Sequence, residues 1–243
     1  MKFRELFSYF TKFEWCLWLG SLAAILMLYF VGSQQDVITL IASLIGATSL
    51  IFVSKGNVAG QFLIIAFSLL YAMVSWKFRY YGEMITYLGM TTPIAIVTAV
   101  VWLRHPYEEG KSEVEVAGLN GRKTALLFVL AAIVTLVFYF ILKFFDTANL
   151  GISTLSVTTS FLAAGLMFLR SPHYATGYAA NDLVLIGMWI LATLEDRSYL
   201  PMVLCFCIFF VNDLYGFINW RRMQNRQQRK INDEKDAESW YSG

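Results

Sequence analysis

Apolar residues fill most of the chain in long runs, and short polar stretches separate them. A helix needs about 20 mostly apolar residues to cross the hydrocarbon core of a bilayer. Runs of this length, or close to it, occur at 15–30, 37–53, 58–76, 84–103, 124–142, 152–169, 178–194 and 200–220. They lack the strict alternation that a membrane β-barrel requires. The pattern therefore predicts an all-α integral membrane protein with about eight transmembrane helices.

The first run admits two interpretations. Lys2, Arg4 and Lys12 precede it, as basic residues precede the apolar core of a secretory signal peptide. No small-residue cleavage site follows, because the run ends in Val31 and then continues Gly-Ser-Gln-Gln. We therefore expect a retained helix.

Composition agrees with the membrane class. Hydrophobic residues make up 58% of the 243 residues and charged residues 15%, against roughly a quarter charged in soluble domains. The net charge of +2 gives no reason to expect nucleic acid as a partner. Cys16, Cys205 and Cys207 lie inside apolar runs, where we expect packing and no disulfide. His105 and His173 are far apart, so no metal site and no cofactor are expected.

Basic residues predict the orientation. If all eight runs cross, the side that holds both termini carries 15 of the 19 Lys and Arg residues, and the opposite side carries 4. Cytoplasmic loops of membrane proteins carry the excess of Lys and Arg. Both termini are therefore expected in the cytoplasm of a multi-pass inner-membrane protein, with residues 221–230 as a solvated extension.

A weak internal repeat relates the second to fourth runs to the sixth to eighth. Thr39-Leu40 precedes Thr154-Leu155 by 115 residues, and Tyr81 precedes Tyr199 by 118. Identity is low, so chance matching remains an alternative. A repeat would give two parallel three-helix units joined by a linker helix, a known transporter plan. The predicted organisation is an N-terminal tail with an accessory helix, a first repeat, a loop with the linker helix, a second repeat and a cytoplasmic tail, at 1–36, 37–103, 104–148, 149–220 and 221–243.

Polar side chains within the runs are the candidates for function, because they are costly in a bilayer. With the predicted orientation, most of them fall in the cytoplasmic half, and several share helical stripes with aromatic or small residues. The candidate substrate-binding residues are Asn57, Gln61, Ser68, Asn181, Asp182, Trp189, Asn212, Tyr215 and Asn219. Amides and aromatic rings suit a ligand that has hydroxyl groups and an aromatic ring, and a positive ring would be attracted further.

A structural role is the alternative for these residues. Amides and hydroxyls also join membrane helices to one another. Aromatic residues near the ends of runs are expected in the interfacial belt; they are Trp76, Tyr80, Tyr81, Trp102 and Trp220. Trp189 is placed near mid-membrane instead. Glu83 is expected at the outer interface, either solvated or paired with Arg79.

The chain shows no energy source of its own. It has no phosphate-binding loop and no nucleophile–base pair in a motif. Asp182 and Asp213 are the only carboxylates clearly within the runs, without a Lys or Arg partner there. A permease is the main interpretation, and the chain is not expected to be an enzyme. A membrane enzyme acting on a lipid and a non-transporting scaffold are the alternatives.

Several segments resemble a known family in order and spacing. They are Gly56-Asn57-Val58-Ala59-Gly60-Gln61, Tyr71-Ala72, Tyr80-Tyr81-Gly82-Glu83, Pro93, Trp102, Tyr199-Leu200 and the run from Asn212 to Trp220. Together they resemble the PnuC family of bacterial nicotinamide riboside transporters over most of runs two to eight. Residues 178–185 depart from the family: the usual tryptophan pair is absent, and Trp189 lies further along.

The resemblance implies a three-plus-one-plus-three core similar to the SWEET sugar transporters, in a homotrimer. It implies uptake of nicotinamide riboside, a vitamin B3 precursor of NAD, by facilitated diffusion, with a cytoplasmic kinase that phosphorylates the substrate and so keeps it inside. Family relatives that carry thiamine or riboflavin provide the alternative substrates.

Overall fold

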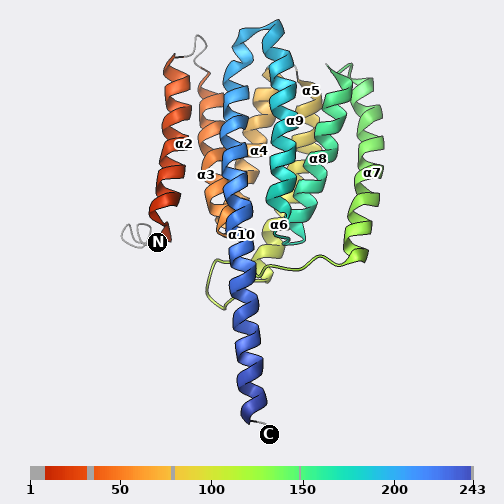
Figure 1. Ribbon diagram of the computed structural model, residues 1–243. Coiled ribbons are helices and arrows are strands. Elements are labelled where there is room, and N and C mark those ends of the chain that lie inside the picture. The colour runs from red at the N-terminus through yellow and green to blue at the C-terminus, as the bar shows by residue number, and fades with distance from the viewer. Residues whose placement is uncertain (1–8, 32–35, 78–79, 148, 242–243) are drawn as a thin grey trace.

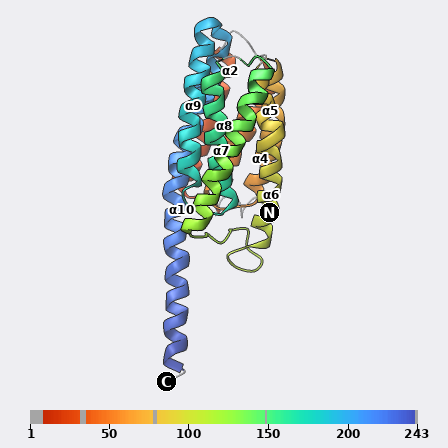
Figure 2. The ribbon, with the colours of Figure 1, turned by 90° about the vertical axis from the view of Figure 1, so that its right-hand side faces the viewer.

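The computed structural model describes residues 9–31, 36–77, 80–147 and 149–241, and shows a bundle of upright helices (Figure 1, Figure 2). In chain order the elements are α2 (Lys12–Val31), α3 (Val37–Ser54), α4 (Ala59–Lys77), α5 (Tyr81–Thr86), the π-helix η1 (Tyr87–Thr91), α6 (Thr92–Arg104), α7 (Gly121–Phe144), α8 (Leu150–Phe168), α9 (Tyr174–Glu195), the 3-10 turn η2 (Arg197–Tyr199) and α10 (Leu200–Tyr241). Because α5, η1 and α6 follow one another directly, they form one span.

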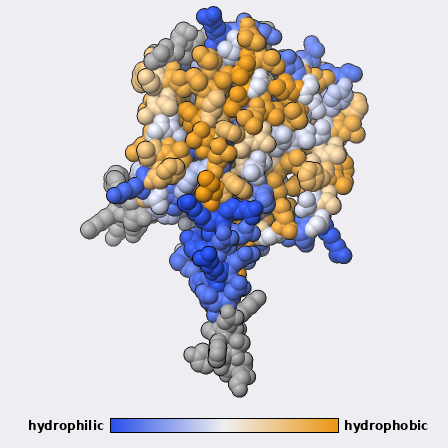
Figure 3. Space-filling model, viewed as in Figure 1, coloured by the Kyte–Doolittle hydropathy of each residue, from blue (hydrophilic) through white to orange (hydrophobic). Residues whose placement is uncertain are grey.

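Within the described residues, eight helical spans are long and apolar enough to cross a membrane, which confirms the predicted fold class and span number. The seventh is longer than its hydropathy indicated, because the helix already begins at Tyr174. Figure 3 shows the exposed apolar band across the bundle, with hydrophilic residues at both ends. Such a band fits the hydrocarbon core of a bilayer.

Six of the spans form a closed ring. Neighbours in contact are α3 with α4, α4 with α6, α6 with α8, α8 with α9, α9 with α10, and α10 with α3. The other two spans lie outside the ring, α2 against α3 and α10, and α7 against α8. In α2 and α7 only 17% of the apolar window is buried, against 39–44% in the six ring spans. The ring therefore contains the core.

Local sequence explains where the helices begin. Asp36 accepts a hydrogen bond from Thr39 N (3.1 Å) at the start of α3, and Asn120 accepts one from Lys123 N (2.8 Å) at the start of α7. Both side chains satisfy backbone donors that have no partner within the helix. At α2, Thr11 and Glu14 bond reciprocally to each other's backbone N–H, which is a capping box.

One end of the bundle, here called the basic end, carries the start of α2, the 104–121 connection and the continuation of α10 (Figure 1). The tail predicted as a solvated extension is largely exposed, and it takes the form of a straight continuation of α10 to which the connection binds. Arg226 pairs with Glu113 at 2.5 Å, and Gln227, 3% exposed, accepts from Val116 N at 2.8 Å. These contacts cover one face of the extension around Gln227, and the helix continues beyond them to Tyr241.

Two predicted interfacial tryptophans are buried instead. Trp102 is 2% exposed, and Trp220 is fully buried. Their rings lie 5.5 Å apart between centroids, and each indole donates to a backbone carbonyl, Met167 O and Val53 O respectively. Trp76, by contrast, is 64% exposed on the bundle surface. The two inward tryptophans close the basic end of the ring because they face other helices and not lipid.

The expectation for Glu83 was also wrong. Its side chain is 2% exposed, and Ser156 on α8 donates a hydrogen bond to it at 2.7 Å. Arg79 lies outside the described residues. The helical turn that α5 adds before η1 directs Glu83 toward α8, so the carboxyl group lies inside the bundle.

Candidate functional site

A cavity lies inside the ring of six spans, near the middle of the bundle. About 50 Å³ of it can hold the centre of a water-sized sphere, which is room for a few water molecules. Its lining residues come from α3, α4, η1, α8, α9 and α10. They are Gly46, Ser49, Leu50, Ile64, Phe67, Tyr87, Thr91, Ser160, Met167, Tyr178, Asn181, Asp182, Phe206, Phe209 and Asp213.

The π-helix η1 places two of these residues. Pro93 has no N–H to donate to the carbonyl four residues earlier, and it follows η1 at the start of α6. The hydroxyl of Thr92 donates to Tyr87 O at 2.8 Å. The local widening of the helix turns Tyr87 and Thr91 toward the cavity. Single π-turns inside α-helices occur frequently at functional sites.

Asn181 is the one amide side chain among the predicted site residues that lines the cavity. It is 3% exposed, and its Oδ1 accepts from the hydroxyls of Thr159 (2.8 Å) and Ser160 (2.9 Å) on α8. Two hydroxyl donors from one helix fix the rotamer of the side chain. The amide is therefore held in place at the cavity wall.

Asp182 and Asp213 meet across the cavity wall. Both are 3% exposed, and both line the cavity as neighbours. The Oδ2 atom of Asp182 has no hydrogen-bond partner. The sequence interpretation treated the two carboxylates separately and included only Asp182 among the site residues. The predicted topology placed both carboxylates at a similar depth, but it did not show that α9 and α10 make them neighbours.

Gln61 and Ser68 lie on α4 beside the cavity and do not line it. Gln61 is fully buried, its Nε2 lies 2.8 Å from the sulfur of Met167, and its Oε1 has no partner. Ser68 shares a hydrogen bond with Thr92 at 2.8 Å. Both residues support the wall of the cavity, because Met167 itself lines it and Thr92 follows Thr91.

Trp189 lies nearer the end opposite the basic end than was expected. It is 15 residues beyond the start of α9, about 22 Å at 1.5 Å per residue, whereas Asp182 is about 12 Å along. Its indole donates to the Tyr71 hydroxyl at 3.1 Å, and its ring packs 4.7 Å from that of Tyr80. Burial raises the pKa of Tyr80 to about 12. This aromatic cluster closes the ring above the cavity.

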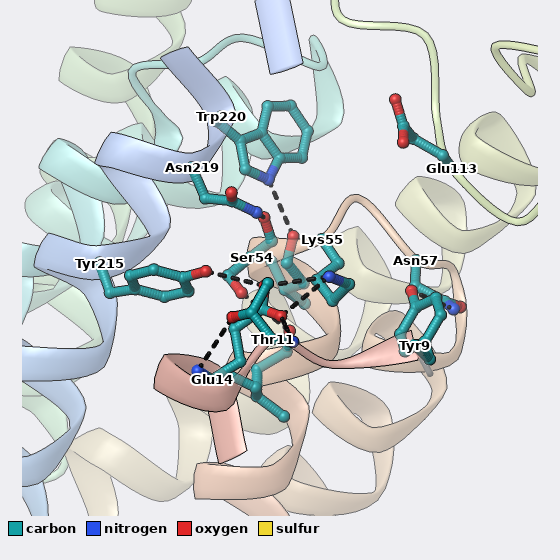
Figure 4. A network of polar contacts seen from close by, with 12 residues as sticks. Tyr9, Thr11, Glu14, Ser54, Lys55, Asn57, Glu113, Tyr215, Asn219 and Trp220 are labelled. Atoms are coloured by element: carbon teal, nitrogen blue, oxygen red, sulfur yellow. Dashed lines mark hydrogen bonds and ion pairs between the residues drawn. The ribbon is translucent and has the colours of Figure 1, made fainter. Parts of the chain in front are cut away.

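Tyr215 and Asn219 belong to a polar network at the basic end (Figure 4). The Glu14 carboxylate, 1% exposed, accepts from Lys55 Nζ (3.0 Å) and from the Tyr215 hydroxyl (2.8 Å). Asn219 donates to Ser54 O at 2.8 Å, which satisfies a carbonyl at the C-terminus of α3. We refer to Glu14, Ser54, Lys55, Tyr215 and Asn219 as the basic-end network. It ties α2, α3 and α10 together outside the cavity.

Asn57 also lies at the basic end. Its Oδ1 accepts from Ala59 N at 2.9 Å at the start of α4, and its Nδ2 donates to Tyr9 Oη (2.9 Å) and Ser112 Oγ (3.1 Å). Burial raises the pKa of Tyr9, although the hydrogen bond with Asn57 acts in the opposite direction. In this structure Asn57 is therefore a helix cap that also fixes the 104–121 connection.

Asn212 faces α2 and not the cavity. Its Nδ2 donates to Ser21 Oγ at 3.0 Å and to Ile208 O at 2.8 Å, while its Oδ1 is buried without a partner. The polar residues selected from the sequence thus separate into three places: the cavity, its supporting wall and the contacts with α2 and the basic end.

The aromatic part of the cavity escaped the sequence analysis. Phe67, Phe206 and Phe209 look like ordinary apolar residues of a membrane helix, so nothing in the sequence distinguishes them from lipid-facing ones. Pro93 within a span was the one usable signal for Tyr87 and Thr91, because a proline there displaces a backbone bond. Only the packing of the ring shows which phenylalanines face inward.

A second, larger and more apolar groove lies between α6, α7 and α8, with about 360 Å³ that can hold the centre of a water-sized sphere. Among the described residues, Lys123 is the only charged one in its lining. The groove faces the outside of the ring, where lipid chains are expected, so we place the candidate site in the central cavity. Within the described residues, no group of three or more His, Cys, Asp or Glu side chains gathers as metal ligands would.

The chain is similar to known transporters. Residues 36–222 match the family model described as nicotinamide mononucleotide transporter. The nicotinamide riboside transporter PnuC of Neisseria mucosa is 28% identical over 227 residues, which cover 92% of this chain and 86% of that protein. The nicotinamide riboside transporter PnuC of Haemophilus influenzae is 25% identical over 224 residues, which cover 92% and 96%. The crystal structure of the vitamin B3 transporter PnuC matches with a TM-score of 0.81 at 26% identity, over 92% of this chain and 97% of that one.

Proposed function

Since the chain belongs to the nicotinamide mononucleotide transporter family and is a multi-pass membrane transporter and not an enzyme, we propose that it takes up nicotinamide riboside through the central cavity. Two relatives bear the name of that activity. The observation that carries the proposal is the lining of the cavity. It combines aromatic faces, the amide of Asn181 and the carboxyl groups of Asp182 and Asp213.

These groups suit the substrate part by part. Nicotinamide riboside joins a positively charged pyridinium ring to a sugar with free hydroxyls. Aromatic faces such as those of Tyr87 and Phe209 attract a cationic ring. The Nδ2 of Asn181 can donate to sugar hydroxyls, since its Oδ1 already accepts from Thr159 and Ser160, and the carboxyl oxygens can accept from them. A carboxyl group close to a cationic ring adds a direct electrostatic attraction, which is strong where little water screens it.

The same lining favours the riboside over the mononucleotide. Among the described residues, those that line the cavity include no Lys or Arg. A phosphate group brings up to two negative charges and is normally held by arginine, lysine or backbone N–H donors. Beside Asp182 and Asp213 it would meet like charges. We therefore infer that the phosphorylated form is excluded.

Transport by facilitated diffusion fits this lining and the absence of a phosphate-binding loop. Phosphorylation of the substrate by a cytoplasmic kinase would then keep the internal concentration of the riboside low. Accumulation of label in cells with and without an active kinase tests this coupling, and we expect accumulation to fail without the kinase. The homotrimer stays a prediction from the family resemblance, which cross-linking of the purified protein tests.

We also infer that the basic end faces the cytoplasm of a bacterial inner membrane, because the topology predicted from the sequence assigns 15 of the 19 Lys and Arg residues to that side. The organisation into two three-helix units is supported by the ring, in which α3, α4 and α5–η1–α6 stand beside α8, α9 and α10. In this proposal α7 is the linker and α2 the accessory helix. A fluorescent protein that fluoresces only in the cytoplasm tests this orientation. When it is fused to the C-terminus, we expect the cells to be fluorescent.

The test of function is counterflow of radiolabelled nicotinamide riboside in proteoliposomes. We expect saturable exchange that unlabelled riboside inhibits and the mononucleotide does not, with thiamine and riboflavin as further competitors. Asn181→Ala should lower exchange strongly. No saturable exchange, with Asn181→Ala and Gln61→Ala indistinguishable from wild type, would contradict the proposal.

A further inference from the structure

The 104–121 connection between α6 and α7 passes below the ring of spans at the basic end (Figure 1). Glu115 N donates to the carbonyl of His105, the residue that follows α6, at 3.0 Å. Val114 N donates to Gly56 O at 2.9 Å in the turn between α3 and α4. These backbone bonds fix the middle of the connection to α3, α4 and α6, which form the first of the two proposed three-helix units.

The same segment is also bound to the α10 extension, through the side chain of Gln227. This amide accepts from Val116 N at 2.8 Å, and it donates to Glu113 Oε1 at 2.9 Å and to Val114 O at 3.1 Å. Gln227 is 3% exposed, so little water competes for these bonds. One side chain of the second unit therefore makes three hydrogen bonds to a segment that is fixed to the first.

Arginine side chains add further contacts between the connection and the second unit. Arg170, in the turn between α8 and α9, pairs with Glu115 at 2.8 Å, and its carbonyl accepts from Ala117 N at 2.9 Å. Arg226 on the α10 extension pairs with Glu113 at 2.5 Å, but its side chain is 60% exposed. Exposed ion pairs are weak, because water and salt screen them. The connection thus joins the two units by contacts that can be broken and remade.

Val114 lies directly in the closed basic end of the ring. It is 1% exposed and belongs to one apolar cluster with Trp102, Trp220 and Met223. The Trp102 indole donates to the carbonyl of Met167, a residue that lines the cavity. Between the cavity and the basic end the bundle is therefore filled by Met167, the two tryptophans and Val114.

A carrier exposes its site to each side in turn by moving one helical unit against the other. At the basic end such a movement has to separate Trp220 of the second unit from Trp102 and Val114 of the first. The bonds of Gln227 oppose this separation, because they join the α10 extension to the segment that contains Val114. The number of contacts that must break there thus depends on the connection.

We propose that the 104–121 connection is a latch that holds the basic end of the transporter closed, and that Gln227 is the residue that fastens it. The basic end opens when the α10 extension releases the connection, which stays bonded to Gly56. This inference rests on the proposed function and deepens it, because it identifies the segment that controls passage at one end. The latch uses no ion gradient, so it agrees with facilitated diffusion.

The direct test fastens the latch chemically. In Glu113→Cys/Arg226→Cys, a short reducible bis-thiosulfonate reagent joins the connection to the α10 extension in place of their ion pair. Counterflow of radiolabelled nicotinamide riboside should fall to the background of empty liposomes after linking and return after reduction. Glu108→Cys/Lys111→Cys is the matched control, because both residues of this ion pair lie within the connection. The linked control should keep its exchange.

A second measurement reports opening without transport. Val114→Cys places a thiol at the buried position, and mass spectrometry of the peptide that contains residue 114 follows its reaction with a water-soluble maleimide. Gln227→Ala in this background should raise the labelling rate by about fivefold or more, which corresponds to the loss of at least one net hydrogen bond. Gln228→Ala is the matched control, because Gln228 is the exposed neighbour on the same helix. It should leave the rate unchanged.

The outcomes separate the two proposals. Absence of counterflow by folded wild-type protein would contradict the proposed function. Counterflow that linking of Glu113→Cys/Arg226→Cys leaves unchanged would overturn the latch alone, and so would an equal loss in the linked control pair. Equal labelling of residue 114 with Gln227→Ala and Gln228→Ala would also overturn it. This labelling decides the question if the unlinked double variant is inactive.

Discussion

The central cavity and the basic-end network hold similar side chains in opposite conditions. Both contain a carboxyl group, an amide and a tyrosine. In the network the carboxylate of Glu14 accepts from Thr11 N, Lys55 and Tyr215, and Asn219 donates to a helix carbonyl. In the cavity Asp182 has an oxygen with no hydrogen-bond partner, and no Lys or Arg is found among the described residues that line the cavity.

The difference distinguishes two roles for polar groups in a membrane. A group whose hydrogen bonds are all made within the protein joins helices, and a ligand would have to break those bonds to bind it. A group with an open acceptor beside a cavity keeps the capacity to bind. The type of residue and its depth in the membrane do not distinguish these roles. The hydrogen-bond partners of the side chain do. The comparison therefore predicts large stability effects at the network and large transport effects at the cavity.

The largest expected effect on stability is that of Glu14→Ala. It leaves the Lys55 ammonium, 18% exposed, without its partner, and breaking a buried ion pair costs about 3 kcal/mol. Thermal unfolding in detergent should show a clearly lower Tm, while riboside exchange per folded molecule stays close to wild type. A normal Tm with lost exchange would reverse the roles assigned to the two regions.

A smaller effect is expected where α4 approaches α3 below the cavity. Gly60 is the second residue of α4, and an added Cβ would lie 2.5 Å from Val53 Cγ2 and 2.7 Å from Val53 N. Gly60→Ala should therefore lower stability by about 2 kcal/mol through overpacking. Gly151 is the second residue of α8 with nothing within 4 Å, so Gly151→Ala is the matched control. The control should be neutral or slightly more stable, because alanine favours the helix. Equal unfolding midpoints in the two variants would contradict the packing argument.

The smallest effect concerns the contact between the 104–121 connection and the α10 extension. Hydrogen bonds from Lys111 and Lys230 lower the pKa of Glu108 to about 2, although the carboxylate is exposed. A carboxylate whose pKa is lowered on folding contributes stability above its unfolded pKa of about 4.3, and this is lost as the pH falls toward 2. Carbon-13 NMR of the Glu108 carboxyl should show a titration midpoint near 2, which moves upward in Lys230→Ala. A wild-type midpoint near the ordinary glutamate pKa of about 4.3 would contradict the contact between Glu108 and the two lysines.

The sequence was sufficient for the fold class, and the reason is physical. Eight apolar runs must be helices in a bilayer, because only helices and closed β-barrels pair their backbone groups there, and the runs lack the alternation of a barrel. The polar stretches between these runs likewise predicted where one helix connects to the next. The sequence could not show that α10 continues as a helix beyond Trp220, because polar residues allow either a coil or a helix until the connection binds to it.

The candidate site was predictable only in part. Asn181 and Asp182 could be selected because polar residues in a span are rare. Asn219 and Tyr215 satisfied the same rule, yet they cap α3 and bind Glu14, and these partners lie 165 and 201 residues away in sequence. Phe67 and Phe209 could not be selected, since hydropathy does not separate lipid-facing from cavity-facing rings. The proximity of Asp213 to Asp182 needed the packing of α9 against α10.

The distinction between the two regions depends on one matched pair of amides, Asn181 in the cavity and Asn219 in the basic-end network. Riboside counterflow in proteoliposomes with equal amounts of folded Asn181→Ala and Asn219→Ala measures it directly. Loss of a substrate contact at Asn181 should lower exchange by roughly tenfold or more, which corresponds to about 1.4 kcal/mol. Asn219→Ala should stay within about twofold of wild type, because it removes one hydrogen bond between helices, worth about 1 kcal/mol of stability. Equal losses in the two variants, or a greater loss in Asn219→Ala, would contradict the assignment of the cavity as the substrate site.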